Sequence, residues 1–276
     1  MSLTKKIDFA VIIGVNNANP NGDPLNGNRP RTNYDGYGEI SDVCIKRKIR
    51  NRLMDNGQAI FVQSDDYRND EYRSLNDRYK SVITNDLQKK SKDEQAAIAC
   101  KSWFDVRAFG QVFSFKETDK EKSVSTPVRG PVSIQSAFSV EPVDISSMQI
   151  AKSVNLTTNK ENPSQKSPDT FGIMKHRVDR GVYVTYGSIN RQLASKTGFT
   201  DVDAEILKAA MVQLFENDES SARPAGSMEV IKVIWWTHEK RTESSAKVHR
   251  SLTVKPDGTY ELTPVDGVEA QAIDAI

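Results

Sequence analysis

The sequence of 276 residues predicts an α+β fold, and three observations support this prediction. Several short segments alternate apolar and polar residues with the period of a β-strand. Two longer segments, one after Ser41 and one at about 201–216, repeat apolar residues at helical spacing. Apart from two polar stretches, the order of these segments is close to a ferredoxin-like βαββαβ core with added strands.

The first strand is predicted at residues 7–15, IDFAVIIGV, and is expected at the centre of the sheet. Its odd-numbered residues are all large and apolar, and they share one face. The opposite face is short and mixed, with Asp8, Ala10, Ile12 and Gly14. We therefore expect other elements to cover both faces of this strand at least partly.

A long loop follows, from residue 16 to about residue 40, and it is rich in Asn, Gly, Pro and Asp. These residue types favour turns, and the Asn side chains offer hydrogen-bond donors. No GKS or GKT sequence follows the loop, so it does not match a P-loop. Loops of this length inside a compact domain are usually functional or disordered.

A helix is predicted next, with Ser41 or Asp42 as its N-cap. The stretch from residue 28 to residue 52, which includes this helix, has seven basic residues against three acidic ones. Five of the basic residues lie on the helix and occupy the faces beside its apolar stripe. Such a helix packs on one side and presents positive charge on the others, which suits a polyanionic partner. The apolar stripe of the helix consists of Ile45, Ile49 and Leu53.

Residues 56–100 are polar and helix-prone, and we expect them to form a helical insertion on the surface. Strands are predicted at 105–115 and 132–140, where apolar and polar residues alternate. The first of these carries Arg107 and aromatic residues on one side, and it faintly resembles the RNP1 pattern of RNA-binding sheets. Residues 144–176 have only a weak pattern and lean basic, which predicts a projecting arm.

The rest of the chain completes the predicted core. Thr200 and Asp203 have the spacing of a capping box at the start of a helix. The predicted elements are a strand at 180–189, this helix at about 201–216, a strand at 229–237 and a terminal hairpin of residues 248–254 and 259–262.

The composition excludes several classes of protein. With 37% hydrophobic and 8% aromatic residues the chain is not disordered, and with two cysteines it is not a disulfide-stapled miniprotein. The longest apolar run, residues 10–15, is far shorter than the roughly 20 residues of a membrane helix. The first residues lack a signal-peptide pattern. We expect a soluble, cytoplasmic protein with reduced thiols and no membrane partner.

Candidate catalytic residues are few. The histidines, His176, His238 and His249, have no metal-ligand spacing, and no GxSxG motif is present. Asp23 is the one carboxylate that we consider as a Mg²⁺ ligand for RNA cleavage, although the sequence Gly-Asp-Pro around it favours an ordinary turn. A metal-dependent ribonuclease using Asp23 therefore stays as the alternative to RNA binding, and a protein-interaction scaffold is a third hypothesis.

Several segments together resemble one family of proteins. These segments are NPNGDP, GNRPR and DVCIKRKIR near the N-terminus, WFDVRAFG and VRGPVSIQSAFSVEPV in the middle, and FGIMKHRVDRGVYVTYGSIN after them. In order and spacing they resemble the backbone subunit of CRISPR Cascade, the Cas-seven group of the RAMP superfamily, in its subtype I-C version. The likeness covers most of the chain, but residues 56–100 and the end of the chain add little to it.

This resemblance implies a fold and an activity. It implies a single RAMP-type domain over residues 1–276, with an RRM-like palm, a helical insertion at about 56–100 and a protruding thumb arm at about 144–178. It implies a protein that is not an enzyme and needs neither cofactor nor metal. Several copies would polymerise along one CRISPR RNA as a helical filament, and each thumb would flip out one nucleotide, so that the guide stays free to pair with target DNA.

The resemblance also implies partners. These are CRISPR RNA, target DNA through the guide, other copies of the chain, and other Cascade subunits, namely a subunit at the 5′ end of the guide, a large PAM-reading subunit and a small subunit. A helicase-nuclease would be recruited to the complex.

The site residues implied by the resemblance all contact RNA. Met174 is the candidate wedge between bases, with Lys175 and His176 beside it on the thumb. The related type III backbone cleaves RNA through an aspartate near the position of Asp23, but the surrounding sequence differs, so the resemblance does not carry that activity over. The other implied contacts are Asn16, Asn19, Asn28 and Arg31 in the loop, Lys46, Arg47 and Arg50 on the basic helix, and Arg107.

Overall fold

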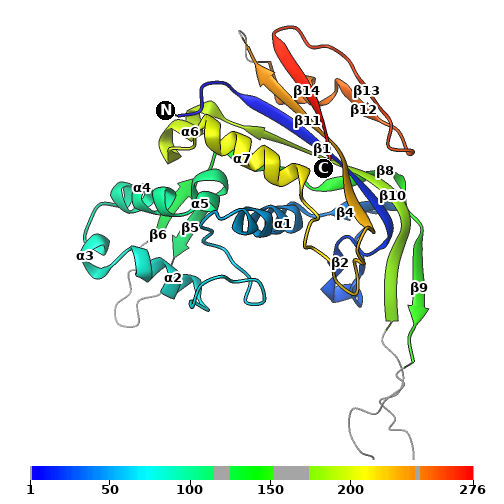
Figure 1. Cartoon of the computed structure of the whole chain (residues 1–276), viewed down its shortest axis with the longest axis horizontal. Helices are drawn as coiled ribbons and strands as arrows, with labels where there is room; N and C mark the ends of the chain where they lie inside the picture. The colour runs from blue at the N-terminus through cyan, green and yellow to red at the C-terminus, as the bar shows by residue number, and fades with distance from the viewer. Residues whose placement is uncertain (1, 115–124, 152–173, 240–242, 276) are drawn as a thin grey trace, which may run out of the picture.

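The computed structural model describes residues 2–114, 125–151, 174–239 and 243–275. An antiparallel sheet in the order β14-β11-β1-β10-β8-β4 is its main feature, and β7 and β9 also pair with β10 (Figure 1). Helices pack on this sheet, so the prediction of a mixed α and β fold is confirmed. The strands are β1 (Ile7–Ala18), β4 (Tyr37–Ile40), β7 (Val132–Ile134), β8 (Ala137–Pro142), β9 (Ile145–Gln149), β10 (Met174–Ile189), β11 (Met228–His238) and β14 (Val268–Asp274).

β1 lies at the centre of the sheet, as predicted. It pairs with β10 on one side and with β11 on the other. Every residue from Ile7 to Ile13 is buried, so both faces of this part of the strand are covered. The neighbouring strand must approach Phe9 closely, because a Cβ atom at Gly187 would lie 2.2 Å from its ring. Glycine is therefore required at position 187.

The other predicted strands of the sheet are present, with changed limits. The strand predicted at 132–140 is divided into β7 and β8 near Gln135, whose carbonyl accepts a hydrogen bond from the Thr185 hydroxyl at 2.7 Å. The strand predicted at 180–189 begins earlier, as part of β10. The strand predicted at 229–237 corresponds closely to β11.

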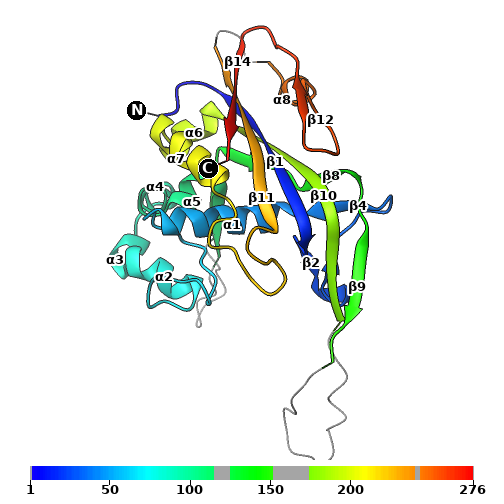
Figure 2. The same cartoon turned by 45° about the vertical axis from the view of Figure 1, so that its right-hand side comes forward.

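Helices cover one face of the sheet (Figures 1 and 2). α1 (Asp42–Asp55) begins at Ser41, whose hydroxyl accepts a backbone N–H, as predicted. α7 (Asp201–Val212) begins with the predicted capping box of Thr200 and Asp203, but it ends before residue 216 because the chain turns there. The core between this face and the helices contains Phe9, Val11, Ile13, Ile45, Ile49, Leu53 and Leu207.

Residues 56–114 contain a second apolar core, separate from the core of the main sheet. The helices predicted for this region are present. Buried Arg78 holds the loop before them, since it donates hydrogen bonds to Asp70 and to the Phe61 carbonyl. The elements are α2 (Leu75–Val82), α3 (Asn85–Gln88), α4 (Lys92–Ser102), α5 (Phe104–Phe109) and β5 (Gly110–Ser114), which pairs with β6 (Ser125–Arg129).

The strand predicted at 105–115 is wrong in its first half, which forms α5. Phe104 and Ala108 lie one helical turn apart and are both buried, so the segment has a helical apolar face as well as an alternating pattern. The strand begins only at Gly110, which has a positive φ of 79°. Arg107 therefore lies on a helix and not on a strand of an RNA-binding sheet.

A two-stranded extension of the sheet projects beyond the other strands (Figures 1 and 2). It consists of β9 and the first five residues of β10, which are paired from Met174 opposite Gln149 to Val178 opposite Ile145. We call this extension the limb. It contains both described ends of the arm predicted at 144–178, and residues 152–173 lie outside the described part of the chain.

The C-terminal elements cover the opposite face of the sheet (Figure 2). The predicted terminal hairpin is present as β12 (Leu252–Val254) and β13 (Tyr260–Leu262). Its first strand does not begin at residue 248, because Ser244 caps a short helix, α8 (Ser245–His249), that buries Val248. The core on this face contains Ala10, Val184, Ile234, Trp236, Val248 and Leu252.

A buried cluster of ionisable groups joins these C-terminal elements to β1. The Oδ2 atom of Asp8 lies 2.7 Å from His238 Nε2 and 3.1 Å from Lys6 Nζ. His249 Nε2 donates to the Gly187 carbonyl at 3.2 Å and lies 3.7 Å from Asp8 Oδ1. Burial raises the pKa of Asp8, but the hydrogen bonds from its neighbours outweigh burial and leave this pKa below its usual value. Burial lowers the pKa of His249.

We predict that acid destabilises the protein through this cluster. The folded chain holds the pKa of His249 below its ordinary value of 6.5, so the unfolded chain takes up this proton first. The free energy of unfolding therefore falls as the pH drops below 6.5. It falls further below pH 3.8, where the unfolded chain protonates Asp8 more readily than the folded chain does. Urea unfolding at pH 7 and pH 5 measures the first effect.

His249→Gln should reduce this difference between the two pH values. The same pH dependence in His249→Gln and in the unmodified protein would contradict the assignment.

None of the helices in the described ranges is long and apolar enough to cross a membrane.

Candidate nucleic-acid interface

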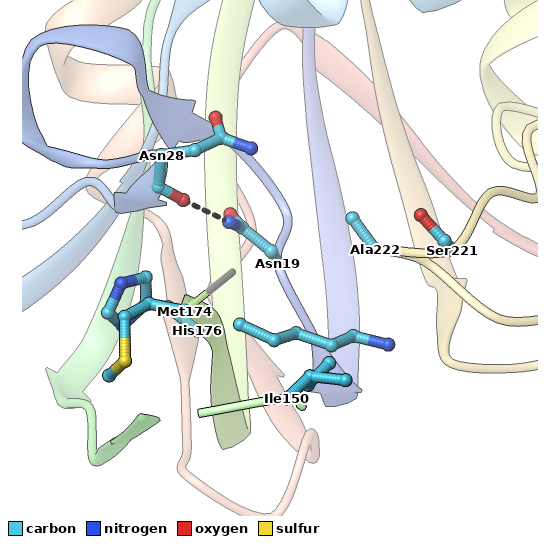
Figure 3. A pocket seen from close by; sticks show the side chains of 8 residues that line it. Asn19, Asn28, Ile150, Met174, His176, Ser221 and Ala222 are labelled. Carbon is cyan, nitrogen blue, oxygen red and sulfur yellow. Dashed lines mark hydrogen bonds between the residues drawn. The ribbon is translucent and has the colours of Figure 1, made fainter. Parts of the chain in front are cut away.

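A pocket of about 320 Å³ lies where the limb meets the end of β1 (Figure 3). We call it the limb pocket. Three separate parts of the chain line it: the turn region after β1, the limb with the residue that follows β9, and the loop between α7 and β11. Its lining residues are Asn19, Asn28, Ile150, Met174, Lys175, His176, Ser221 and Ala222.

The segment after β1 folds back on itself and thereby brings Asn28 to Asn19. β2 (Gly22–Asp23), a 3₁₀ turn η1 (Pro24–Asn26) and β3 (Arg29–Pro30) form this small hairpin. The long loop predicted from residue 16 to residue 40 is therefore largely ordered into short elements, including the edge strand β4. Asn28 takes a left-handed conformation with φ 60°, which asparagine tolerates better than most residues.

Hydrogen bonds fix Asn19 between the hairpin and the α7–β11 loop. Its side-chain Nδ2 donates to the Asn28 carbonyl at 2.7 Å (Figure 3). Its backbone N–H donates to the Ala222 carbonyl at 2.9 Å. Asn19 is only 4% exposed. This side of the pocket is thus held in place by the fold itself.

The limb side of the pocket combines apolar and polar groups. Met174 and Ile150 are about half exposed, at 46% and 48%. His176 Nδ1 lies 2.8 Å from Ser147 Oγ, and the same oxygen accepts a hydrogen bond from Arg29 Nη1 at 3.0 Å. An apolar surface next to a lysine, a histidine and amides can hold a base or ribose while cations contact the phosphates.

Five of the residues predicted to contact RNA come together in the limb pocket, although they are far apart in sequence. They are Asn19, Asn28, Met174, Lys175 and His176. Two more lie on neighbouring elements without lining it. Asn16 is exposed near the end of β1, and Arg31 follows β3 and forms an ion pair with Asp23 at 3.4 Å.

The cations predicted on the basic helix divide into two groups. Lys46, which is 24% exposed, pairs with Asp42 at 2.9 Å. Arg47, which is 58% exposed, pairs with Asp66 at 3.4 Å. Arg50 instead packs inward, with its Nε 2.9 Å from the buried carboxylate of Asp105. Lys46 and Arg47 are thus placed to meet an external anion, whereas Arg50 has a structural partner.

Arg107 is likewise held by contacts within the fold. Its Nη2 donates to Asp203 at 2.8 Å, and its guanidinium lies 4.7 Å from the centre of the Phe104 ring. Neither Arg107 nor Arg50 lines the limb pocket. Both arginines instead have their charges paired within the fold.

Asp23 has the role of a turn residue. It is the N-cap of η1, where Oδ1 accepts from the Leu25 N–H at 3.2 Å, and the same oxygen pairs with Arg31. Within the described ranges, no three His, Cys, Asp or Glu side chains are grouped so that they could hold a metal ion. These contacts match the turn interpretation of the Gly-Asp-Pro sequence.

Sequence reasoning missed part of this site. Arg29 was counted only as one of the basic residues, and its contact with Ser147 has no signal in the sequence because 118 positions separate the two residues. Ser221 and Ala222 reach the pocket only because backbone hydrogen bonds tie their loop to the end of β1, such as that from the Asn19 N–H to the Ala222 carbonyl. The local sequence of that loop contains no nucleic-acid motif.

The fold and the site define a mixed α and β protein in which a large antiparallel sheet and a projecting limb carry a pocket lined by amides and a lysine. The chain belongs to the family described as CRISPR-associated protein Cas7, whose family model matches residues 5–274. It is 25% identical over 242 residues to the CRISPR-associated protein Cas7 of Haloferax volcanii, which covers 82% of this chain and 68% of that protein. The predicted membership in the Cas-seven group is thereby confirmed.

Two solved structures are also similar to the chain. One is a chain of a "CRISPR RNA-guided surveillance complex, pre-nicking", with a TM-score of 0.48 and 15% identity, covering 88% of this chain and 81% of that one. The other is a chain of a "CRISPR RNA-guided surveillance complex", with a TM-score of 0.44 and 18% identity, covering 95% of this chain and 77% of that one.

Proposed function

We propose that this protein is a non-catalytic backbone subunit that binds CRISPR RNA in a Cascade surveillance complex of subtype I-C. The single observation that carries the proposal is the limb pocket, where three distant segments bring amides, a lysine and a histidine to one surface beside apolar limb residues. Such a surface contacts phosphate, ribose and base faces without reading the sequence. Membership in the Cas7 family supports the same role.

We propose an RRM-like core for the sheet. Along the chain the central elements come in the order β1, α1, β8, β10, α7 and β11, and in the sheet the four strands lie in the order β11-β1-β10-β8. This arrangement agrees with a βαββαβ unit. Within a single domain of residues 1–276, the region 56–100 serves as the helical insertion and the region 144–178, which includes the limb, as the thumb.

The interface that we propose centres on the limb pocket. Met174 is the apolar wedge, with Lys175 and His176 beside it, and Asn19 and Asn28 form the opposite wall. Asn16, Arg31, Lys46 and Arg47 extend the contact with the RNA backbone along the neighbouring surface.

The partners in this proposal follow from the family. Other copies of the chain polymerise along the same RNA, and the target DNA pairs with the guide that they present. The complex further contains a subunit at the 5′ end of the guide, a large PAM-reading subunit and a small subunit. It recruits a helicase-nuclease in the cytoplasm.

The first test is the salt dependence of RNA binding. Each phosphate that a protein contacts on a single strand contributes a slope of about −0.7 to the plot of log affinity against log salt. With about four contacts, affinity should fall roughly six-hundredfold between 0.05 and 0.5 M salt. Fluorescence anisotropy with two labelled single-stranded RNAs of unrelated sequence measures this fall, and the two should agree. An affinity that does not change with salt concentration would contradict the proposal.

The second test addresses the alternative of a metal-dependent ribonuclease. Labelled RNA incubated with the protein and Mg²⁺ should stay intact, with the unmodified chain and with Asp23→Ala alike. Cleavage by the unmodified chain that is lost in Asp23→Ala would establish the ribonuclease instead.

A further inference from the structure

Ser147 connects two parts of the proposed interface through one hydroxyl group. Arg29 Nη1 lies 3.0 Å from Ser147 Oγ, and His176 Nδ1 lies 2.8 Å from the same oxygen. Arg29 belongs to β3 in the hairpin after β1, whereas Ser147 and His176 lie on the two strands of the limb. The hydroxyl therefore links the hairpin to the limb at the edge of the limb pocket.

The chemistry of these groups fixes the direction of the hydrogen bond between Arg29 and Ser147. A guanidinium group only donates, so the Ser147 oxygen accepts from Arg29. The same oxygen also lies within hydrogen-bond distance of Nδ1 of His176, at 2.8 Å, and a hydroxyl group can either donate to this nitrogen or accept from it. Alanine at position 147 would remove both hydrogen bonds, and threonine would keep them.

Arg29 retains most of its hydrogen-bonding capacity. A guanidinium group has five N–H donors, and Arg29 uses one of them on Ser147. Within the described ranges its side chain forms no other hydrogen bond or ion pair. The planar fork of a guanidinium group matches a phosphate, and a guanidinium already held in position loses less conformational freedom on binding.

We propose that Arg29 binds a phosphate of the RNA backbone at the edge of the limb pocket and that Ser147 positions it for this contact. Because Ser147 belongs to the limb and Arg29 to the hairpin, their hydrogen bond also sets the limb against the hairpin, so that both sides of the interface meet one stretch of RNA. This inference rests on the proposed function, and it adds a binding residue and a positioning residue to it.

The test compares five variants by anisotropy with a labelled single-stranded RNA at several salt concentrations. Arg29→Ala should weaken binding about tenfold and make the salt slope shallower by about 0.7, since one phosphate contact is lost. Ser147→Ala should weaken binding about threefold to tenfold with little change in slope, because the cation is retained. Ser147→Thr should bind like the unmodified chain.

Ser146→Ala is the matched control. Ser146 lies next to Ser147 on the same strand, but its hydroxyl donates to Asp179 at 2.7 Å and not to the Arg29–His176 pair. This variant should keep normal affinity. Thermal unfolding of all variants separates a loss of binding from a loss of fold.

The double variant Arg29→Ala/Ser147→Ala completes the test. If Ser147 acts through Arg29, the double variant should bind no more weakly than Arg29→Ala alone. Additive losses, or normal binding by Ser147→Ala while the unmodified chain shows the expected salt dependence, would overturn the inference and leave the proposed function standing. Failure of the unmodified chain to bind RNA would overturn the proposed function and this inference together.

Discussion

Replacing Asp105 with alanine should lower the free energy of unfolding by about 3–5 kcal/mol, the range measured when one partner of a buried ion pair is removed. Asp105 is only 1% exposed. Its Oδ2 lies 2.9 Å from Arg50 Nε, and its Oδ1 accepts the Phe61 N–H at 2.7 Å. The Val62 N–H also donates to this carboxylate, at 3.1 Å. The substitution therefore leaves one guanidinium and two backbone N–H groups without their partner.

Urea denaturation at neutral pH measures this change, and Asp66→Ala provides the matched control. Asp66 also accepts from an arginine of α1, since it pairs with Arg47 at 3.4 Å, but both side chains are mostly exposed. An exposed pair contributes about 1 kcal/mol or less, so this variant should unfold almost like the unmodified protein. A loss of similar size in both variants would show that burial of Asp105 is not the cause.

The second large effect is expected on RNA binding, from Lys175→Glu on the limb. This change removes one cation from the limb pocket and adds one anion, which alters the local charge by two. At a slope of about 0.7 per charge on a single strand, affinity in 0.1 M salt should fall roughly twentyfold. The loss should shrink as salt is added, because counterion release is the source of the effect. Anisotropy titrations over a range of salt concentrations measure both features.

Lys101→Glu is the control for this prediction. Lys101 is exposed on α4, in the helical region that Figure 1 shows on the other side of the molecule from the limb. The substitution changes the net charge of the protein by the same amount. If Lys101→Glu weakened binding as much as Lys175→Glu, overall charge and not the limb pocket would account for the interaction.

The sequence alone was enough to predict several elements, because their signals are local. The apolar alternation of residues 7–15 predicted the central strand, since a strand covered on both faces tolerates few polar residues. Ser41 predicted the start of α1, and Thr200 with Asp203 predicted the start of α7, because an N-cap bonds to N–H groups within the next three residues. The family resemblance was likewise contained in short motifs.

Two strands were predicted in the wrong place because the local sequence pattern fits a helix as well as a strand. Residues 105–115 alternate apolar and polar side chains like a strand, yet Phe104 and Ala108 also lie one helical turn apart. In the helix, the buried carboxylate of Asp105 accepts hydrogen bonds from the backbone N–H groups of Phe61 and Val62. Val248 was assigned to a strand, but the cap at Ser244 and burial against the sheet place it in α8. In both segments, packing in the folded protein outweighed the alternation of apolar and polar residues that had predicted a strand.

What the sequence determined by itself is the class of fold, the central strand, the helix starts and the set of cations near the N-terminus. Tertiary contacts decide which cations of the whole chain are available to a ligand. Arg50 and Arg107 are turned toward Asp105 and Asp203, because a charge that packs against the core needs a partner there. Arg29 and Lys175 instead lie at the limb, where pairing of β9 with β10 brings Ser147 to His176. Side chains of the same type thus take different roles according to which distant residues the fold places beside them.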